Sequence, residues 1–348
     1  MSIAKVLFRV DAGPSIGLGH LQRSLSLATA LQTSDVESLF LGPDDSGTVE
    51  RIGQFGYAFK PLPKSQPWSL DDARGTQDVA DNEECSTIIV DSHQVGAEYL
   101  SHLRDAGLFV ALRDDLAGFP FPCQLVINGN ADAKKLGYFS SSGDTVFLLG
   151  TDYMVLGQEY WDWPSLTNDR PVENVLVTVG GTDDFNLMPQ IIETLDRLPG
   201  CFSLTAIVGP FFENVGAVEQ AASRMSRKIK LYHNPPNLHD AIVEADLAVS
   251  AAGQTLYELA CAGCPTVAFS VASNQQSQME NLAEAGFLRM AGCATNDDVI
   301  GGVGETVRSL LKGADARSVM ASAGRRLVDG QGALRVVQQL LTTTGNPV

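Results

Sequence analysis

Short apolar segments that end on glycine or polar residues recur along the chain, and most are followed by a segment with helical periodicity. The first, residues 4–10, is followed by a glycine-containing loop and then by apolar residues at helical spacing from about His20 to Leu31. Strands that alternate with helices form parallel sheets, because a parallel connection needs a crossover segment. In such open sheets, ligands bind at the carboxyl ends of the strands. The sequence therefore predicts an α/β fold whose functional residues follow its strands.

The alternation falls into two series, and 348 residues are enough for two domains with separate cores. Residues 158–171, which contain tryptophan and proline but no periodic pattern, interrupt the alternation. We expect a Rossmann-like N-terminal domain over residues 1–157 and a Rossmann-like C-terminal domain over 172–348. The two doubly wound domains would face each other across a cleft. Residues 61–76 lack periodicity and are predicted to form a loop.

Charge and composition exclude several classes of function. The net charge of −17 argues against nucleic-acid binding, which needs a basic face. No apolar run is long enough to span a membrane, and no signal sequence precedes the first strand, so we expect a cytoplasmic protein. Among the scattered cysteines, only Cys261 and Cys264 have a redox or zinc spacing, and no second pair completes a metal site. Neither a metal nor a cofactor is predicted.

The loop after the first strand carries Gly17 and Gly19 and leads into a helix that opens on His20. It lacks the Gly-Lys-Ser/Thr of a P-loop and the third glycine of a dinucleotide-binding loop. Glycines let the backbone approach a ligand closely. The partial positive charge of a helix amino terminus favours a neutral imidazole, which suits a general base. A tight turn with a capping histidine is the alternative interpretation.

Two loops of the second series join a strand to a helix amino terminus, where backbone N–H groups can bind a diphosphate. A carboxylate one turn into the second of these helices would accept the hydroxyls of a ribose, or would be a solvated residue favoured by the helix dipole. Amides at the head of a third helix would hold sugar hydroxyls or acyl groups. Glycines in purely structural turns are the alternative. The residues concerned are Gly180, Gly181, Thr182, Ala252, Gly253, Gln254, Thr255, Glu258, Asn274 and Gln275.

Short stretches along nearly the whole chain carry a resemblance to a known family. They are residues 8–12, 17–20 with Arg23, 90–92, 114–116, 148–150 with Tyr153, 177–183, 251–255 with Glu258, 274–275, and 329–333 with Arg335. The second half resembles the nucleotide-sugar-binding domain of the GT-B fold in MurG-like glycosyltransferases. The whole chain is similar to the PseG/SpsG family, typified by UDP-2,4-diacetamido-2,4,6-trideoxy-β-L-altropyranose hydrolase of pseudaminic acid biosynthesis.

This resemblance implies an inverting, metal-independent attack of water on a UDP-2,4-diacetamido-2,4,6-trideoxyhexose bound between the domains. His20 would activate the water, and Asp11 and Arg23 would shape its loop. The residues that would hold UDP are Gly180, Gly181, Ala252, Gly253 and Glu258, and those that would contact the sugar or the phosphates are Asn274 and Gln275. One alternative is an inverting GT-B glycosyltransferase of cell-surface polysaccharide synthesis, in which an acceptor hydroxyl replaces water. Another is a nucleotide-sugar-binding protein without catalytic activity.

Three positions of the N-terminal half depart from the family pattern. His93 stands where the family has tyrosine, Arg113 stands where an apolar residue is common, and no arginine lies near Gly157. This half would read the sugar or the acceptor. His93 would assist His20 or bind the sugar, or would be a structural polar residue. The sequence leaves the exact sugar, the base and the oligomeric state open, and it is compatible with a monomer.

Overall fold

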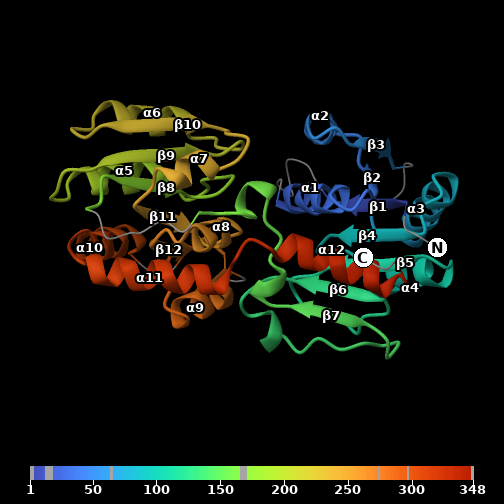
Figure 1. Ribbon diagram of the computed structural model, residues 1–348. Helices are drawn as coiled ribbons and strands as arrows, with labels where there is room; N and C mark the ends of the chain where they lie inside the picture. The colour runs from blue at the N-terminus through green and yellow to red at the C-terminus, as the bar shows by residue number, and fades with distance from the viewer. Residues whose placement is uncertain are drawn as a thin grey trace. The chain divides into compact units, whose positions relative to one another are not determined.

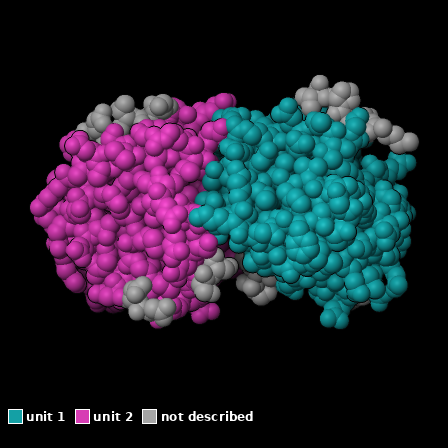
Figure 2. All heavy atoms as spheres, turned by 90° about the horizontal axis from the view of Figure 1, so that it is seen from below, with its two compact units in different colours: residues 1–161, 330–348 teal, residues 162–329 magenta. Residues whose placement is uncertain are grey.

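The computed structural model describes residues 4–11, 19–62, 66–164, 171–272, 275–295 and 298–345. The chain forms two compact units and passes between them twice (Figure 2). Unit 1 comprises Met1–Trp161 together with Gly330–Val348, and unit 2 comprises Asp162–Asp329. Each unit is built on one parallel sheet covered by helices (Figure 1), as the sequence predicts.

The sheet of unit 1 has seven parallel strands in the order β3-β2-β1-β4-β5-β6-β7. The order reverses between β1 and β4, where Val10 pairs with Asp91, so the topological switch point lies there. The strands are β1 (Lys5–Val10), β2 (Glu37–Gly42), β3 (Ala58–Pro61), β4 (Thr87–Asp91), β5 (Phe109–Arg113), β6 (Leu125–Asn128) and β7 (Val146–Leu149).

Two layers of helices cover this sheet because alternate strand residues point to opposite faces. Phe8 and Ile89 pack on the face that holds α1, whereas Leu7 and Ile88 pack on the face that holds α4. The α-helices of unit 1 are α1 (Gly19–Gln32), α2 (Ser46–Gln54), α3 (Leu70–Asn82), α4 (Ala97–Asp105) and α12 (Gly332–Thr343). Three short 3₁₀ turns are η1 (Ala133–Lys135), η2 (Thr151–Tyr153) and η3 (Gln158–Tyr160).

Helix α12 belongs to unit 1, whereas the sequence analysis counts it with the C-terminal domain. Its Val336 and Leu340 are buried in the same core as Leu21 and Leu25 of α1. Apolar periodicity predicts that α12 is a helix with one buried face. It does not predict which of two sheets that face covers.

Helix α3 begins inside the stretch that the sequence analysis predicts to be a loop. Ser69 caps it by accepting the Asp72 N–H. Asp72 is 1% exposed and accepts from Arg9 Nη2 at 2.9 Å, and the Arg9 guanidinium stacks 3.9 Å from the centre of the Trp68 ring. A buried ion pair, rather than a row of apolar side chains, anchors this end of α3. Apolar periodicity therefore does not mark where the helix begins.

The sheet of unit 2 has six parallel strands in the order β10-β9-β8-β11-β12-β13, and its switch point lies between β8 and β11. The strands are β8 (Asn174–Thr178), β9 (Ser203–Val208), β10 (Ile229–His233), β11 (Leu247–Ala251), β12 (Thr266–Ser270) and β13 (Leu288–Cys293). The sequence analysis missed β13, an edge strand in which Arg289 and Met290 are exposed.

Helices α5, α6 and α10 pack around one apolar core of unit 2, with Val177, Ile191 and Val303 at its centre. The helices of this unit are α5 (Leu187–Asp196), α6 (Val215–Ser223), α7 (His239–Val243), α8 (Thr255–Ala262), α9 (Gln276–Glu284), α10 (Val299–Lys312) and α11 (Ala314–Leu327). None of the helices in the described part of the chain has the length and hydropathy that crossing a membrane requires.

Replacement of Gly332 tests the attachment of α12 to unit 1. A Cβ on Gly332 would lie 2.1 Å from the Met154 carbonyl oxygen, so Gly332→Ala forces the backbones apart. We expect a loss of about 1–3 kcal/mol in the free energy of unfolding, measured by urea denaturation. The control is Gly53→Ala in α2, where no atom lies within 4 Å of the added Cβ. Equal effects of the two substitutions would contradict the packing described.

Candidate active site

His20 and Arg23 lie one turn apart on α1 and share one carboxylate at the end of β4. His20 Nδ1 lies 2.7 Å from Asp91 Oδ1, and Arg23 Nε donates to Asp91 Oδ2 at 2.7 Å. Arg23 Nη2 also donates to Asp91 Oδ1, and Ser24 Oγ donates to Oδ2 at 3.3 Å. Asp91 is completely buried. The helix is thus fastened to the switch point of the sheet by one carboxylate.

The ionisation of Asp91 fixes the tautomer of His20. Burial raises the pKa of Asp91, but the charge and hydrogen bonds of Arg23 outweigh burial and hold that pKa well below its usual range. An imidazole nitrogen 2.7 Å from an ionised carboxylate oxygen carries the proton, because two acceptors would repel. Nδ1 of His20 also lies 2.9 Å from Arg23 Nη2, which can only donate, but its contact with the ionised carboxylate is shorter and favours a proton on Nδ1. In this tautomer, Nε2 is the ring nitrogen that can accept a proton.

A second carboxylate extends this arrangement to His93. Asp115 Oδ2 accepts from Arg23 Nη1 at 2.7 Å and lies 3.0 Å from His93 Nε2. Burial raises the pKa of Asp115, but Arg23 and the His93 hydrogen bond hold it well below its usual range. The ring centres of His93 and His20 are 4.5 Å apart, with the rings edge to face. Arg23 thus links two carboxylates, each of which holds one histidine.

Asp11 supports the segment that follows β4. It receives hydrogen bonds from Ser92 Oγ and from Trp68 Nε1, the latter at 3.1 Å to each oxygen. Its backbone N–H donates to the Asp91 carbonyl at 3.1 Å. Burial raises the pKa of Asp11, while the Ser92 hydrogen bond opposes that shift.

Sequence reasoning named His20, Arg23, Asp11 and His93 as candidates, and the structure places these four residues near one another. It did not name Asp91 and Asp115 as site residues, although Asp91 ends β4 and Asp115 is the second residue after β5. That position is the signal that would have found them. Gly19 is the first residue of α1, and Gly17 lies outside the described residues.

In unit 2, the glycine loop after β8 is held by backbone contacts. Gly180 has a φ of +101°, a conformation that favours glycine. A Cβ on Gly209 would lie 2.5 Å from the carbonyl oxygens of Gly180 and Gly181, so β9 approaches the loop closely. Phe211 N–H donates to the Gly181 carbonyl at 3.0 Å.

The loops after β8 and β11 start side by side, because Thr178 pairs with Ser250 in the sheet. Ala252, Gly253 and Gln254 precede α8, and Thr255 is its first residue. Glu258 is half-buried one turn into this helix. At the start of α5, two of the backbone N–H groups that were expected to bind a diphosphate already have an acceptor. The Asp183 carboxylate accepts the N–H groups of Leu187 at 2.7 Å and Met188 at 3.0 Å. The exposed residues 180–182 of the preceding loop are therefore the part of the predicted diphosphate site that is still available here.

The third predicted element of this site is the segment before α9. Gln275 precedes the helix, and its side-chain oxygen accepts the Val271 N–H at 3.0 Å. Asn274 lies outside the described residues. Because β12 is the neighbour of β11, Gln275 shares the carboxyl edge of the sheet with the two loops. Each predicted set of residues thus lies at the switch point of its own sheet.

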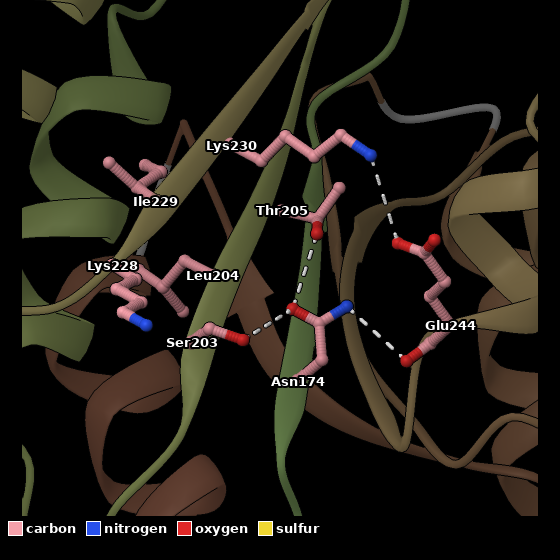
Figure 3. A pocket seen from close by; sticks show the side chains of 8 residues that line it. All are labelled: Asn174, Ser203, Leu204, Thr205, Lys228, Ile229, Lys230 and Glu244. Carbon is pink, nitrogen blue, oxygen red and sulfur yellow. Dashed lines mark hydrogen bonds and ion pairs between the residues drawn. The ribbon is translucent and has the colours of Figure 1, made fainter.

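A cavity of about 250 Å³ lies at the opposite, amino edge of the unit 2 sheet (Figure 3). Asn174 there accepts from Ser203 Oγ at 3.3 Å and Thr205 Oγ1 at 3.2 Å, and it donates to the Glu244 carbonyl at 3.3 Å. The polar groups around Asn174 form hydrogen bonds with one another, so we assign the cavity no role. Within the described ranges, no three His, Cys, Asp or Glu side chains are grouped to hold a metal ion.

Comparisons with known proteins confirm the resemblance to SpsG and PseG. No family model matches the chain. It is 22% identical to the spore coat polysaccharide biosynthesis protein SpsG of Bacillus subtilis, over 94% of each chain. It is 24% identical to UDP-2,4-diacetamido-2,4,6-trideoxy-β-L-altropyranose hydrolase of Campylobacter jejuni, over 81% of this chain and 97% of the relative. An uncharacterized protein of Methanocaldococcus jannaschii is 24% identical over 76% of this chain, and the match spans 55% of that relative.

Solved structures establish the fold as GT-B. MurG of Acinetobacter baumannii superposes with a TM-score of 0.71 at 14% identity, covering 97% of this chain and 99% of MurG. The UDP complex of MnaA from S. aureus gives a TM-score of 0.62 at 14% identity, covering 99% and 98% of the two chains.

The pKa of His93 provides a test of the carboxylate network. The Asp115 hydrogen bond raises this pKa above its ordinary value, so the pair stabilises the fold below pH about 6.5 and loses that contribution as pH rises through the raised pKa. We expect Asp115→Asn to lower the pKa of His93, measured by NMR titration of its ring protons. His93→Gln identifies the signal, and His102, which bonds to Gln77, is the internal reference. An unchanged His93 titration in Asp115→Asn would contradict the network.

Proposed function

We propose that this protein is a cytoplasmic hydrolase that cleaves UDP from a UDP-2,4-diacetamido-2,4,6-trideoxyhexose, with inversion at the anomeric carbon and with His20 as the base. The product sugar would serve synthesis of the pseudaminic acid type. The observation that carries the proposal is the pair of His20 with the buried, ionised Asp91, which presents Nε2 as a proton acceptor. The similarity to the C. jejuni hydrolase supports the substrate class.

The reaction requires one proton transfer and one bond exchange. His20 Nε2 takes a proton from water, and the water oxygen attacks the anomeric carbon. The bond from that carbon to the β-phosphate oxygen breaks, and UDP leaves with the electron pair. Asp91 holds the productive tautomer of His20 and stabilises the imidazolium that forms, as a carboxylate does in Ser-His-Asp sites.

Unit 2 would bind the nucleotide. The leaving diphosphate gains negative charge as the bond breaks, and backbone N–H groups of residues 180–182 and 252–254 are suited to stabilise it without lysine or arginine. Glu258 would accept the ribose hydroxyls, and Asn274 and Gln275 would contact the sugar or the phosphates. The UDP complex of MnaA supports uridine diphosphate as the ligand of this fold.

A glycosyltransferase is the second candidate, because an acceptor hydroxyl in place of water would use the same base and the same leaving group. The similarity to MurG supports this candidate through the fold alone, and one fold can carry several functions. The two candidates differ in whether UDP is released when no acceptor is present.

Release of UDP from a panel of UDP-diacetamido sugars without acceptor tests the proposal. We expect wild type to release UDP and His20→Ala to lower kcat by about 10²–10⁴-fold, the contribution typical of a general base. UDP affinity, measured by calorimetry, should not change. His102→Ala on α4 is the matched control. UDP binding without release in wild type would favour the transferase, and full activity of His20→Ala would exclude His20 as the base.

Discrimination between UDP and 2′-deoxy-UDP tests Glu258. A charged hydrogen bond contributes about 1.5–3 kcal/mol, so wild type should bind UDP roughly 10- to 100-fold more tightly than the deoxy ligand. Glu258→Gln should reduce this ratio by weakening UDP binding while leaving deoxy-UDP binding nearly unchanged. An identical ratio in the two proteins would remove Glu258 from the ribose site.

A further inference from the structure

Arg113 is a buried cation, and two of its donor atoms have no acceptor among the described residues. It is the last residue of β5 and is 2% exposed. Within the described part of the chain, its Nε and Nη1 atoms are buried and have no hydrogen-bond partner. Burial of a guanidinium costs free energy unless hydrogen bonds or ion pairs compensate. The presence of this residue therefore needs an explanation beyond packing.

Strand register places Arg113 beside the candidate base. Strands β4 and β5 are neighbours in the sheet (Figure 1), and Asp91 pairs with Arg113. Ile89 and Ala111, two residues earlier in each strand, both pack in the core that contains α1. Because side chains alternate along a strand, Asp91 and Arg113 point to this same face, where His20 lies.

The neighbouring carboxylates do not need Arg113 as a hydrogen-bond donor. Asp91 receives its hydrogen bonds from His20, Arg23 and Ser24. Asp115 in turn is bonded to Arg23, His93 and Asn130. Arg113 interacts with both carboxylates through its charge alone. Such an interaction is stronger in a buried site than in water.

Arg23 and Arg113 oppose the charge of the two carboxylates that hold His20 and His93. Asp91 and Asp115 contribute two negative charges, and Arg23 and Arg113 contribute two positive ones. Burial and the repulsion of Arg23 lower the pKa of Arg113 to about 10, so it is still charged at neutral pH. Removing Arg113 would leave an excess negative charge beside His20.

The other ionisable groups that face His20 are Asp11 at the end of β1 and His93 after β4. Asp11 is held by Ser92 and Trp68. Residues 12–18, which precede α1, contain no ionisable side chain. Arg9 also interacts by charge with Asp11, but its guanidinium is paired with Asp72. Arg113, in contrast, interacts by charge with Asp91 and Asp115.

We propose that Arg113 is a positioning residue for the reaction: its guanidinium offsets the charge of Asp91 and Asp115 and so opposes protonation of the base His20 before water is bound. The inference rests on the proposed role of His20 as base. Without Arg113, the negative charge of Asp91 and Asp115 would favour the protonated form of His20, which cannot activate water.

The test is an NMR titration of His20 in the ligand-free protein, which needs no substrate. We expect Arg113→Met to move the midpoint of the His20 titration to higher pH by about one unit, because loss of a nearby positive charge favours the protonated imidazole. Arg113→Lys, which keeps the charge, should leave the midpoint near that of wild type. His20→Gln identifies the signal.

Stability and activity separate this role from a structural one. Because Arg113→Met leaves the buried Asp91 and Asp115 without its charge, we expect a lower Tm than that of wild type, and Arg113→Lys, which keeps the charge, should restore it. The acidic limb of the pH profile for UDP release should move up with the His20 midpoint, with the rate retained at high pH. If no UDP is released by any variant, the proposed function fails while the titration still decides the charge effect.

A folded Arg113→Met protein with an unmoved His20 midpoint would overturn the inference, and a lowered Tm with that result would assign Arg113 a structural role. If Arg113→Met does not fold, Arg113→Gln, which is neutral but polar, takes its place. The same upward shift is expected of it, and an unmoved midpoint there would equally overturn the inference.

Discussion

The buried carboxylate of Asp91 is the constraint on which the first half of the protein depends. It lies where the strand order reverses, and its two oxygens receive donors from three residues of α1. An ionised group without exposure is stable only when its lone pairs are occupied. The position and rotation of α1 are therefore fixed by electrostatics at its amino end and by apolar packing along the rest of its length.

The two units share a sheet topology but build their sites from different chemistry. At the switch point of unit 1, three charged side chains, Asp91, Asp115 and Arg23, are joined with two histidines by hydrogen bonds. At the switch point of unit 2, the residues are mainly glycine, alanine and threonine. The chain after β9 can lie close to the loop of Gly180 and Gly181 because Gly209 carries no side chain. Ionised side chains suit proton transfer, whereas backbone N–H groups suit a diphosphate.

Much of this arrangement could be predicted from the sequence, because strand-ending polar residues and glycines mark the carboxyl edge directly. The parallel α/β architecture was predicted in this way, and His20 was singled out by its place at the start of the helix after the first glycine loop, whereas Arg23 was named only through the family resemblance. Asp91 and Asp115 were within reach of the same argument, but pairing across the sheet requires the strand order. The start of α3 could not be predicted from the sequence, because it is anchored by an ion pair between Arg9 and Asp72, which are 63 residues apart. The sheet covered by α12 depends on contacts that periodicity does not encode.

The double passage of the chain between the units has a consequence for synthesis on the ribosome. Unit 2 is continuous, so all of its strands and helices are available once residue 329 has been made. Unit 1 is begun earlier, yet α12 reaches it only after the whole of unit 2 has been translated. Until then, the apolar side chains of α1 that α12 covers lack that part of their packing. The part of the protein that is made first is thus completed last, and folding factors would meet it with α1 partly uncovered.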